Sequence, residues 1–238
     1  KTTTAMNLAA SLAAMEFKTL VVDADPQANT TSGLGHNPRE ITESIYECMV
    51  GKNTIQECLL ETEVEYLTLL PSHIDLVGAE VEMVSLNTRE EKMREVLNQV
   101  KGSYDFILID CAPSLGLITI NALTASDSVL IPVQCEYFAL EGLSALLNTI
   151  RRINETVNPD LEIEGILRTM YDPRNSLTTE VSEQLFSHFG DLVYRTVIPR
   201  NVRLAEAPSH GEPGIVYDRY SRGARAYMAL AEEFTRRQ

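Results

Sequence analysis

The residue types best suited to chemistry stand at the start of the chain and at the ends of two apolar runs. The chain begins Lys1-Thr2-Thr3, which matches the end of the phosphate-binding pattern G-x-x-x-x-G-K-[ST]. In that pattern the lysine reaches the β- and γ-phosphates of a nucleotide, and the hydroxyl after it ligates Mg²⁺. The Ala-rich stretch Thr4–Met15 follows with helical spacing of its apolar residues. Thr2 is therefore predicted to lie just inside a helix N-terminus, where backbone amides favour an anion.

Two carboxylates, Asp23 and Asp25, follow the short apolar run Thr19–Val22. At the end of a strand they can face one ligand, with one tuning a metal site and the other orienting an attacking water. Pro26 fixes the turn that follows. A turn held by Asx-type backbone bonds explains the same residues without any ligand, so both interpretations stay open at this point.

A third carboxylate, Asp110, ends the apolar run Phe106–Ile109. An apolar strand that ends in Asp is the Walker B pattern, in which the carboxylate holds Mg²⁺, whereas an Asp that caps the next helix is the alternative. Each pattern is weak by itself. Together with Lys1-Thr2 and the Asp23/Asp25 pair, Asp110 completes the charged parts of a nucleotide–Mg²⁺ site, and the combination predicts such a site.

Strand-like and helical runs alternate along the chain, which predicts an α/β fold with a parallel twisted sheet and helices on both faces. The strand-like runs are Leu20–Asp23, Tyr66–Pro71, Phe106–Asp110, Ser128–Val133, Ile163–Met170 and Leu192–Pro199. After the first helix, the helical patterns are Ile74–Val84, Arg89–Val100, Leu140–Val157, Thr178–His188 and Arg222–Arg236. The run Phe106–Asp110 is nearly all apolar, as a strand buried on both faces should be. Residues 1–238 are predicted to form one domain, with an acidic insertion over residues 35–65 packed at one side.

Ligands of such sheets bind beyond the carboxyl ends of the strands, and further polar residues follow the later strands. They are Gln134 and Glu136, then Asp172 and Arg174, and finally Arg200, Asn201 and Arg203. The carboxyl edge of the sheet is therefore where we expect the site.

The formal net charge of −14 argues against a general nucleic-acid binder. Residues 195–225, however, contain six arginines and three acidic residues, a local charge of +3, while the acidity is concentrated between Glu40 and Glu82. A basic face on an acidic protein is therefore compatible with this sequence.

The sequence contains no run of about 18 apolar residues, so no membrane-spanning helix is expected. Four scattered cysteines are expected to be buried, reduced thiols of a cytoplasmic protein; they are Cys48, Cys58, Cys111 and Cys135.

Five stretches of the chain resemble the ParA/Soj family of chromosome and plasmid partition ATPases, which belongs to the deviant Walker A (MinD-like) class. The stretches are 1–9, 22–35, 104–116, 131–143 and 197–211. They include Val22-Asp23-Ala24-Asp25-Pro26-Gln27, and the last two are specific to the chromosomal branch of the family. The resemblance covers essentially the whole chain and implies an AAA-type P-loop ATPase domain.

The resemblance implies roles at the nucleotide. Lys1 is expected to contact the phosphates and to contribute to catalysis, and Thr2 to ligate Mg²⁺, with Thr3 at the α-phosphate. Asp25 is expected to orient the lytic water, with Asp23 and Asp110 at the metal.

The resemblance also implies contacts away from the phosphates. Pro199 and Asn201 fall where the family contacts the adenine base. Arg174 and Arg203 fall at positions linked to sequence-independent DNA binding.

The implied function is a weak ATP hydrolase that acts as a switch. The cofactors would be ATP and Mg²⁺, and the ATP-bound homodimer would bind non-specific double-stranded DNA of the nucleoid. A ParB-type DNA-binding protein would stimulate slow hydrolysis and so release the dimer. The implied location is cytoplasmic and nucleoid-associated, without membrane binding.

The sequence departs from the family pattern in two ways. Ala28 stands where the family has Gly, which should matter only if the backbone there needs a positive φ. The first strand of the family fold, the Gly-rich half of the loop and the lysine that reaches across the dimer are not in this sequence. We therefore predict that residues 1–238 alone bind ATP poorly; affinity equal to that of a chain with the complete loop would contradict this.

Two other functions require features that parts of this sequence resemble. A MinD-like membrane-cycling regulator of cell division needs an amphipathic C-terminal membrane helix, but the apolar positions of the last helical run fit a stripe that packs on the sheet; they are Tyr227, Leu230, Ala231 and Phe234. A reductase of the nitrogenase iron-protein type needs cluster-ligating cysteines. Cys111 and Cys135 lie in no Gly-rich ligand loop and are interpreted as structural.

Overall fold

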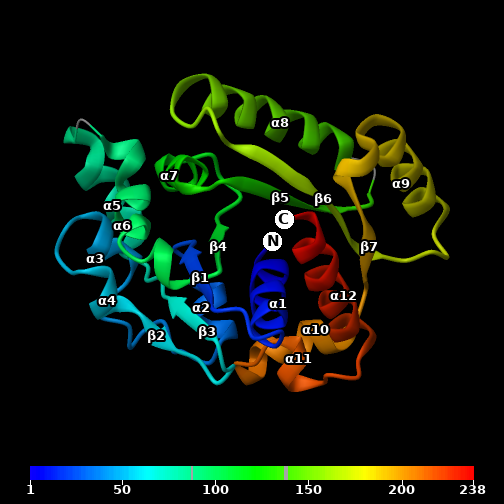
Figure 1. Cartoon of the computed structure of the whole chain (residues 1–238), viewed down its shortest axis with the longest axis horizontal. Helices are drawn as coiled ribbons and strands as arrows, with labels where there is room; N and C mark the ends of the chain where they lie inside the picture. The colour runs from blue at the N-terminus through cyan, green and yellow to red at the C-terminus, as the bar shows by residue number, and fades with distance from the viewer. Residues whose placement is uncertain (87, 137–138) are drawn as a thin grey trace.

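Alternating strands and helices build the computed structural model, which describes residues 1–86, 88–136 and 139–238 (Figure 1). Tyr137 and Phe138, part of the family-like stretch 131–143, lie outside the described residues. The order of the elements confirms the predicted α/β class.

The first sheet contains four strands in the order β2-β3-β1-β4. Strands β3 (Leu67–Leu70), β1 (Thr19–Ala24) and β4 (Phe106–Cys111) are parallel, and the short β2 (Leu60–Glu61) is an antiparallel edge. All six residues of β1 are buried because β1 has a strand on either side and helices on its faces. The sheet thus holds the first and third predicted strands next to each other.

The second sheet contains β5 (Ser128–Gln134), β6 (Glu162–Tyr171) and β7 (Val193–Pro199), all parallel. The parallel strands are thus divided between two sheets, because no described strand pairs with the facing edges of β4 and β5. The expectation that Phe106–Ile109 are buried on both faces is wrong for the same reason: each of these residues is partly exposed.

Helices cover both faces of the second sheet, as expected (Figure 1). On one face, α8 (Ala139–Thr156) and α9 (Ser176–Phe189) contribute to one core. On the other, α1 (Thr2–Ala13) packs against α12 (Arg222–Arg237). The predicted stripe on α12 is buried in this second core, where Tyr227, Leu230 and Phe234 meet Leu8 and Leu12 of α1. Its packing on the protein is therefore confirmed.

The first sheet is flanked by a helical layer and by the predicted insertion. The layer contains α5 (Leu76–Glu82), α6 (Lys92–Asn98) and α7 (Leu117–Ala125). The insertion lies at one side of the molecule, as expected, and holds α3 (Ile45–Met49), α4 (Ile55–Cys58) and β2 (Figure 1). The sequence did not predict α7, because its apolar residues surround the helix and give no helical periodicity.

Short elements complete the chain near the carboxyl-end loops and between the longer helices. They are α2 (Asn29–Gly33), α10 (Val202–Glu206), α11 (Gly214–Tyr217) and five 3₁₀ turns at Met83–Ser85, Arg89–Glu91, Lys101–Ser103, Gly190–Leu192 and Ala207–His210. Among the residues described, no helix is both long and apolar enough to span a lipid bilayer.

Candidate functional site

Asp23 and Asp110 lie side by side at the carboxyl ends of two adjacent parallel strands. They are register partners in the pairing of β1 with β4. Asp23 is fully buried and Asp110 is 3% exposed. The structure thus brings together two carboxylates that are 87 positions apart in the sequence.

Two adjacent threonines of α2 hold these carboxylates. The backbone N–H and the hydroxyl of Thr31 both donate to Oδ2 of Asp23, each at 2.8 Å. The hydroxyl of Thr30 donates to Oδ2 of Asp110, also at 2.8 Å. Our sequence reasoning missed Thr30 and Thr31; the signal that was present is a pair of hydroxyl residues one short turn after the carboxylates.

Asp25 lies in the turn between β1 and α2. Its N–H donates to Oδ1 of Asp23 at 3.2 Å, and its own Oδ1 accepts from the N–H of Gln27 at 2.9 Å. The Asx-type turn that was one interpretation of this pair is therefore present. It also uses only one oxygen of Asp25, and no described donor contacts Oδ2, so the turn leaves that oxygen for a ligand.

Ala28 ends this turn with a φ of 51° and a ψ of 39°, in the left-handed region. The backbone at Ala28 therefore has the positive φ at which a methyl group in place of the family's Gly is unfavourable. We expect Ala28→Gly to raise the free energy of unfolding by about 0.5–1 kcal/mol, because glycine adopts this conformation without steric cost. Urea denaturation of the two proteins measures the change, and an unchanged or lower stability would contradict the expectation.

Lys1 and Thr2 stand at the start of α1, next to the same carboxylates. Lys1 is the N-cap of α1. The first residue lies near the Asp110 carboxylate. Thr2 lies close enough to the Asp110 side chain to help hold the pKa of Asp110 down. The predicted conjunction of Lys1, Thr2, Asp23, Asp25 and Asp110 is therefore present in space.

Burial dominates the electrostatics of this cluster. It raises the pKa of Asp23 to about 6, against the hydrogen bonds from Thr31 and Asp25, and the Asp110 carboxylate adds to the shift. Burial also raises the pKa of Asp110 above its ordinary value. Two ionised carboxylates are thus unfavourable here without a cation.

The raised pKa of Asp23 predicts a pH dependence of stability. Its contribution is fully present below the unfolded value of 3.8 and is lost as the pH rises through about 6. At about pH 5, one unit below the folded value, wild type gains about 1.4 kcal/mol relative to about pH 7.5. The side chain of Asn in Asp23→Asn does not titrate, so the variant does not lose this stability as the pH rises. The difference between the two free energies of unfolding, variant minus wild type, should therefore be about 1.4 kcal/mol larger at about pH 7.5 than at about pH 5. A difference that stays constant in urea titrations would contradict the assignment.

The donor set fits Mg²⁺. Among the described residues no group of three His, Cys, Asp or Glu side chains could hold a metal ion alone. Mg²⁺ is commonly bound by one or two carboxylates together with phosphates and waters. The Thr2 hydroxyl and the Asp110 carboxylate provide such hard oxygen ligands.

A second group of predicted residues lies at the carboxyl ends of β5, β6 and β7. Pro199 ends β7 opposite Tyr171. The side chain of Asn201 accepts from the N–H of Leu204 at 3.3 Å and so caps α10. A hollow of about 170 Å³ opens at this edge, and Gln134, Glu136, Asp172 and Arg200 contribute to its lining.

Both arginines predicted for DNA binding are ion-paired. Arg174 donates from Nε and Nη2 to the carboxylate of Asp172 at 2.9 and 2.8 Å, which lowers the pKa of Asp172 to about 2. Arg203 pairs with Glu206 at 3.0 Å and with Asp218 at 3.5 Å. The side chains of the two arginines remain 88% and 53% exposed.

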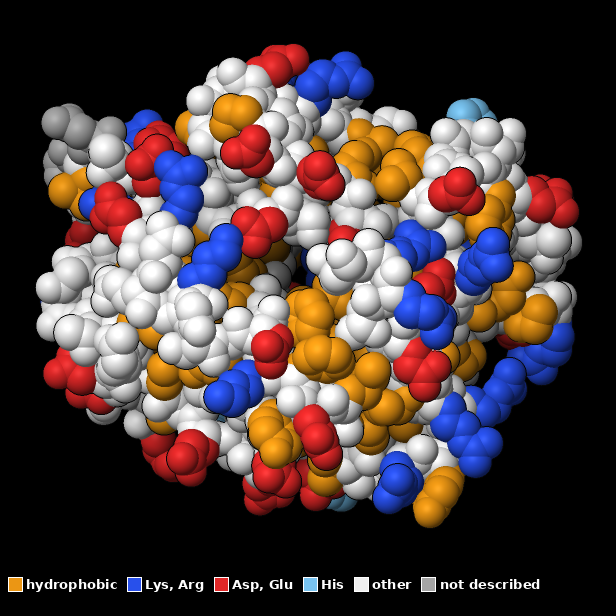
Figure 2. Space-filling model, in the orientation of Figure 1, with side chains coloured by type: hydrophobic (Ala, Val, Ile, Leu, Met, Phe, Trp, Pro, Cys, Tyr) orange, Lys and Arg blue, Asp and Glu red, His pale blue; other side chains and the backbone are white. Residues whose placement is uncertain are grey.

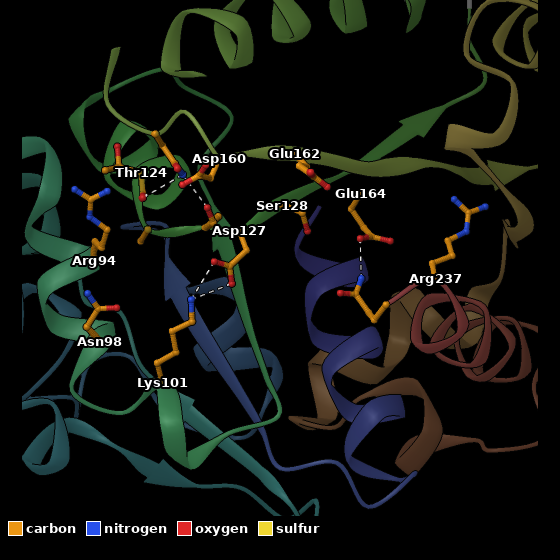
Figure 3. Close-up of a pocket in the computed structure, with 14 residues that line it drawn as sticks. Arg94, Asn98, Lys101, Thr124, Asp127, Ser128, Asp160, Glu162, Glu164 and Arg237 are labelled. Atoms are coloured by element: carbon orange, nitrogen blue, oxygen red, sulfur yellow. Dashed lines mark hydrogen bonds and ion pairs between the residues drawn. The ribbon is translucent and has the colours of Figure 1, made fainter. Parts of the chain in front are cut away.

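Another hollow, of about 600 Å³, lies at the opposite edge of the second sheet (Figure 3). It is lined near the amino ends of β5 and β6 by Ser128 and Glu162, and it contains the Lys101–Asp127 ion pair at 3.0 Å. None of the predicted site residues lines it. We place the site at the carboxyl edge, because the carboxylates and the helix N-terminus converge there.

Comparison with known proteins identifies the family. Residues 1–163 match the model of a family described as "AAA domain". The sporulation initiation inhibitor protein Soj of Bacillus subtilis is 54% identical over 98% of this chain and 92% of its own length. The chromosome partitioning protein ParA of Myxococcus xanthus is 52% identical over 100% of this chain and 84% of its own length. The chain belongs to the ParA/Soj family.

Solved structures agree with this membership. This ParA/Soj-family chain is similar to cobyrinic acid a,c-diamide synthase of Mycobacterium smegmatis with bound ADP and magnesium, with a TM-score of 0.86 and 34% identity over 99% of this chain and 88% of that one. It is also similar to a putative plasmid partition protein of Borrelia burgdorferi bound to AMPPNP, with a TM-score of 0.82 and 25% identity over 99% and 93% of the two chains. The P-loop ATPase fold predicted from the sequence is thus confirmed.

Proposed function

We propose that this chain is the ATP-hydrolysing domain of a chromosome- or plasmid-partitioning switch, with residues 1–238 forming one domain. In the ATP state two copies form a homodimer that binds double-stranded DNA without sequence preference. Slow Mg²⁺-dependent hydrolysis, stimulated by a ParB-type partner, ends that state. The observation that supports this proposal most directly is the pairing of Asp23 with Asp110 beside the Lys1-Thr2 helix start.

Each residue of the cluster has a distinct role at the nucleotide. Lys1 binds the phosphates, Thr3 lies at the α-phosphate, and Thr2 and Asp110 hold Mg²⁺, which neutralises phosphate charge when bound. Asp23 contributes charge at the metal, but both its oxygens already accept protein hydrogen bonds. Its main role is therefore to hold the Asp25 turn and α2 in place.

Asp25 orients the attacking water. Its second oxygen is free of described donors, and the residue is 9% exposed, so a water can reach it from the site. A carboxylate that positions water, without an arginine finger in the same chain, suits a slow hydrolase. A slow hydrolase in turn lets the ATP state persist long enough to hold DNA.

The adenine base binds at the second group of residues. Pro199 and Asn201 stand at the carboxyl end of β7, beside the hollow of about 170 Å³ that Arg200 helps to line. In an α/β sheet the ligand occupies the carboxyl edge of several strands, which suits a nucleotide with its phosphates at Thr2 and its base at Asn201.

DNA binds through arginines on the side of the molecule formed by β7, α10 and α12. Figure 2 shows Lys and Arg side chains gathered there, whereas acidic side chains predominate at the lower left. Besides Arg203, the exposed basic residues of this region include Arg195, Arg200, Arg219, Arg222 and Arg225. Such a face meets DNA phosphates despite the net charge of −14. DNA binding would also keep the protein in the cytoplasm, on the nucleoid.

One experiment tests the proposal. A chain that carries the complete Gly-rich loop is titrated onto a non-specific DNA duplex with ATP–Mg²⁺, with ADP–Mg²⁺ and without nucleotide. We expect retention only with ATP and a steep loss with added salt. Equal DNA binding with ATP, with ADP and without nucleotide would contradict the proposed switch.

Vesicle co-sedimentation separates this proposal from the MinD-like alternative. The apolar residues of α12 are already buried against α1 and the second sheet, so α12 can enter a membrane only by leaving that core. We expect the ATP-bound protein to stay in the supernatant with vesicles rich in anionic lipid.

A further inference from the structure

Helix α5 and the 3₁₀ turn after it carry apolar side chains on two opposite faces. The inner face is fully buried in the core of the first sheet through Leu76, Ala79 and Met83. The outer face, together with Ile74 in the turn just before the helix, exposes four aliphatic residues, named here the α5 stripe: Ile74, Val77, Val81 and Val84, which are 55, 57, 75 and 61% exposed. Their spacing of three, four and three positions places them on one side of a helix. A surface helix that is apolar on both sides indicates a second binding surface.

The α5 stripe also has a gap that suits a facing helix. Gly78 lies between Ile74 and Val81 on the same side, and a Cβ placed on it would meet no atom within 4 Å. A side chain from an opposing helix can therefore insert there, as knobs insert into holes between packed helices.

The acidic residues around the α5 stripe favour a partner with basic residues. From Asn53 to Thr88 the sequence contains seven acidic residues and neither Lys nor Arg. Asp75 and Glu82, at the two ends of α5, have side chains that are 65% and 50% exposed. Glu82 lies 3.9 Å from the exposed Lys52 and Asp75 lies 3.3 Å from His73, and a partner's cation can replace such exposed pairs because they contribute little. A partner with basic flanks is attracted to this surface, while anionic membrane is repelled.

We propose that the α5 stripe is the docking surface for a basic amphipathic helix of a partner protein. The proposal rests on the proposed function, since it names where the partner that stimulates hydrolysis binds. The helix lays its aliphatic side across Val77 and Val81, inserts one side chain over Gly78, and places Lys or Arg side chains against Asp75 and Glu82.

The α5 stripe is connected to the catalytic carboxylates through two hydrogen bonds. The loop between β3 and α5 contains Ser72, whose N–H donates to the hydroxyl of Thr31 at 3.0 Å. That hydroxyl donates in turn to Oδ2 of Asp23 at 2.8 Å. Ser72 precedes Ile74 by only two residues, so a helix that shifts α5 also shifts Thr31 and the Asp23–Asp25 turn. Docking thereby changes the position of the residue that orients water.

The test compares Val77→Ser/Val81→Ser with Val202→Ser/Val216→Ser. The second pair removes exposed valines elsewhere, which are 68% and 45% exposed. The probe is a fluorescein-labelled helical peptide with leucines along one side and lysines on both flanks; a scrambled peptide of the same composition is the control. We expect fluorescence anisotropy to show binding to wild type and the control variant, and at least about ten-fold weaker binding to the α5 variant. Equal affinity of the two variants, or equal binding of the scrambled peptide, would overturn the proposal.

A second measurement uses the ParB-type partner and a chain with the complete Gly-rich loop. The α5 variant should keep the basal rate of ATP hydrolysis but lose its stimulation, because neither valine touches the nucleotide site. Normal stimulation would overturn the docking surface, whereas a missing basal rate in wild type would refute the proposed function and leave the peptide result standing. Sedimentation checks for a second copy as the occupant: nucleotide-free dimers that dissociate only in the α5 variant would also overturn the proposal.

Discussion

Asp25→Ala is expected to lower the rate of ATP hydrolysis by about 10²–10³-fold while ATP-dependent dimerisation persists. The change removes the carboxylate that positions water but leaves the Thr2 and Asp110 oxygens that hold the metal. One Asp25 oxygen is occupied by the N–H of Gln27, and the other is free of described donors, so the loss concerns chemistry more than folding. Phosphate release and analytical ultracentrifugation with ATP measure the two effects in a chain with the complete Gly-rich loop.

Two controls sharpen this prediction. Asp25→Asn preserves an acceptor for the N–H of Gln27 but not the carboxylate charge. It should hydrolyse ATP about as slowly as Asp25→Ala. Asp160→Ala removes an exposed carboxylate far from the cluster and should hydrolyse ATP at the wild-type rate. Wild-type phosphate release from Asp25→Ala would remove Asp25 from the mechanism.

Replacing Arg174 and Arg203 together by alanine is expected to remove most DNA binding by the ATP-bound dimer. Two arginines from each of two protomers make four phosphate contacts, so the slope of log affinity against log salt should become shallower by about 3–4. At moderate salt the affinity should fall on the order of 10²-fold or more. The ion pairs of these arginines do not prevent binding, because exposed pairs contribute little and a phosphate can replace the carboxylate.

Removing the acidic partner of one of these arginines should have the opposite effect on DNA binding. Glu206→Gln frees Arg203 from its 3.0 Å partner and should strengthen DNA binding. Arg39→Ala removes an exposed arginine from a different region and should leave binding unchanged. ATP binding should be equal in all these variants. Equal retention of the double variant and wild type on a non-specific duplex would contradict the assignment.

The sequence by itself determined the composition of the site. Lys1 and Thr2 precede an Ala-rich helix, and Asp23 and Asp110 each end an apolar run. Because parallel strands share one carboxyl edge, their meeting was predictable without coordinates. The burial of Tyr227 on α12 was predictable as well, since helical periodicity identifies the side that faces the core.

Only the tertiary structure decided how these residues are held. Thr30 and Thr31 acquire their partners through the close approach of α2 to β1 and β4, which no local pattern encodes. The positive φ of Ala28 is imposed by the same turn. The ion pair of Arg203 with Asp218 likewise joins residues that only the fold brings together.

The tertiary structure also decided which apolar surfaces are covered. The exposed α5 stripe consists of residues that the sequence marks simply as hydrophobic. Periodicity shows that a side chain avoids water but not which neighbour covers it, because that neighbour is distant in sequence. For this chain the sequence therefore determined what chemistry the site can perform, and the fold decided how the carboxylates are held and which surfaces remain for partners.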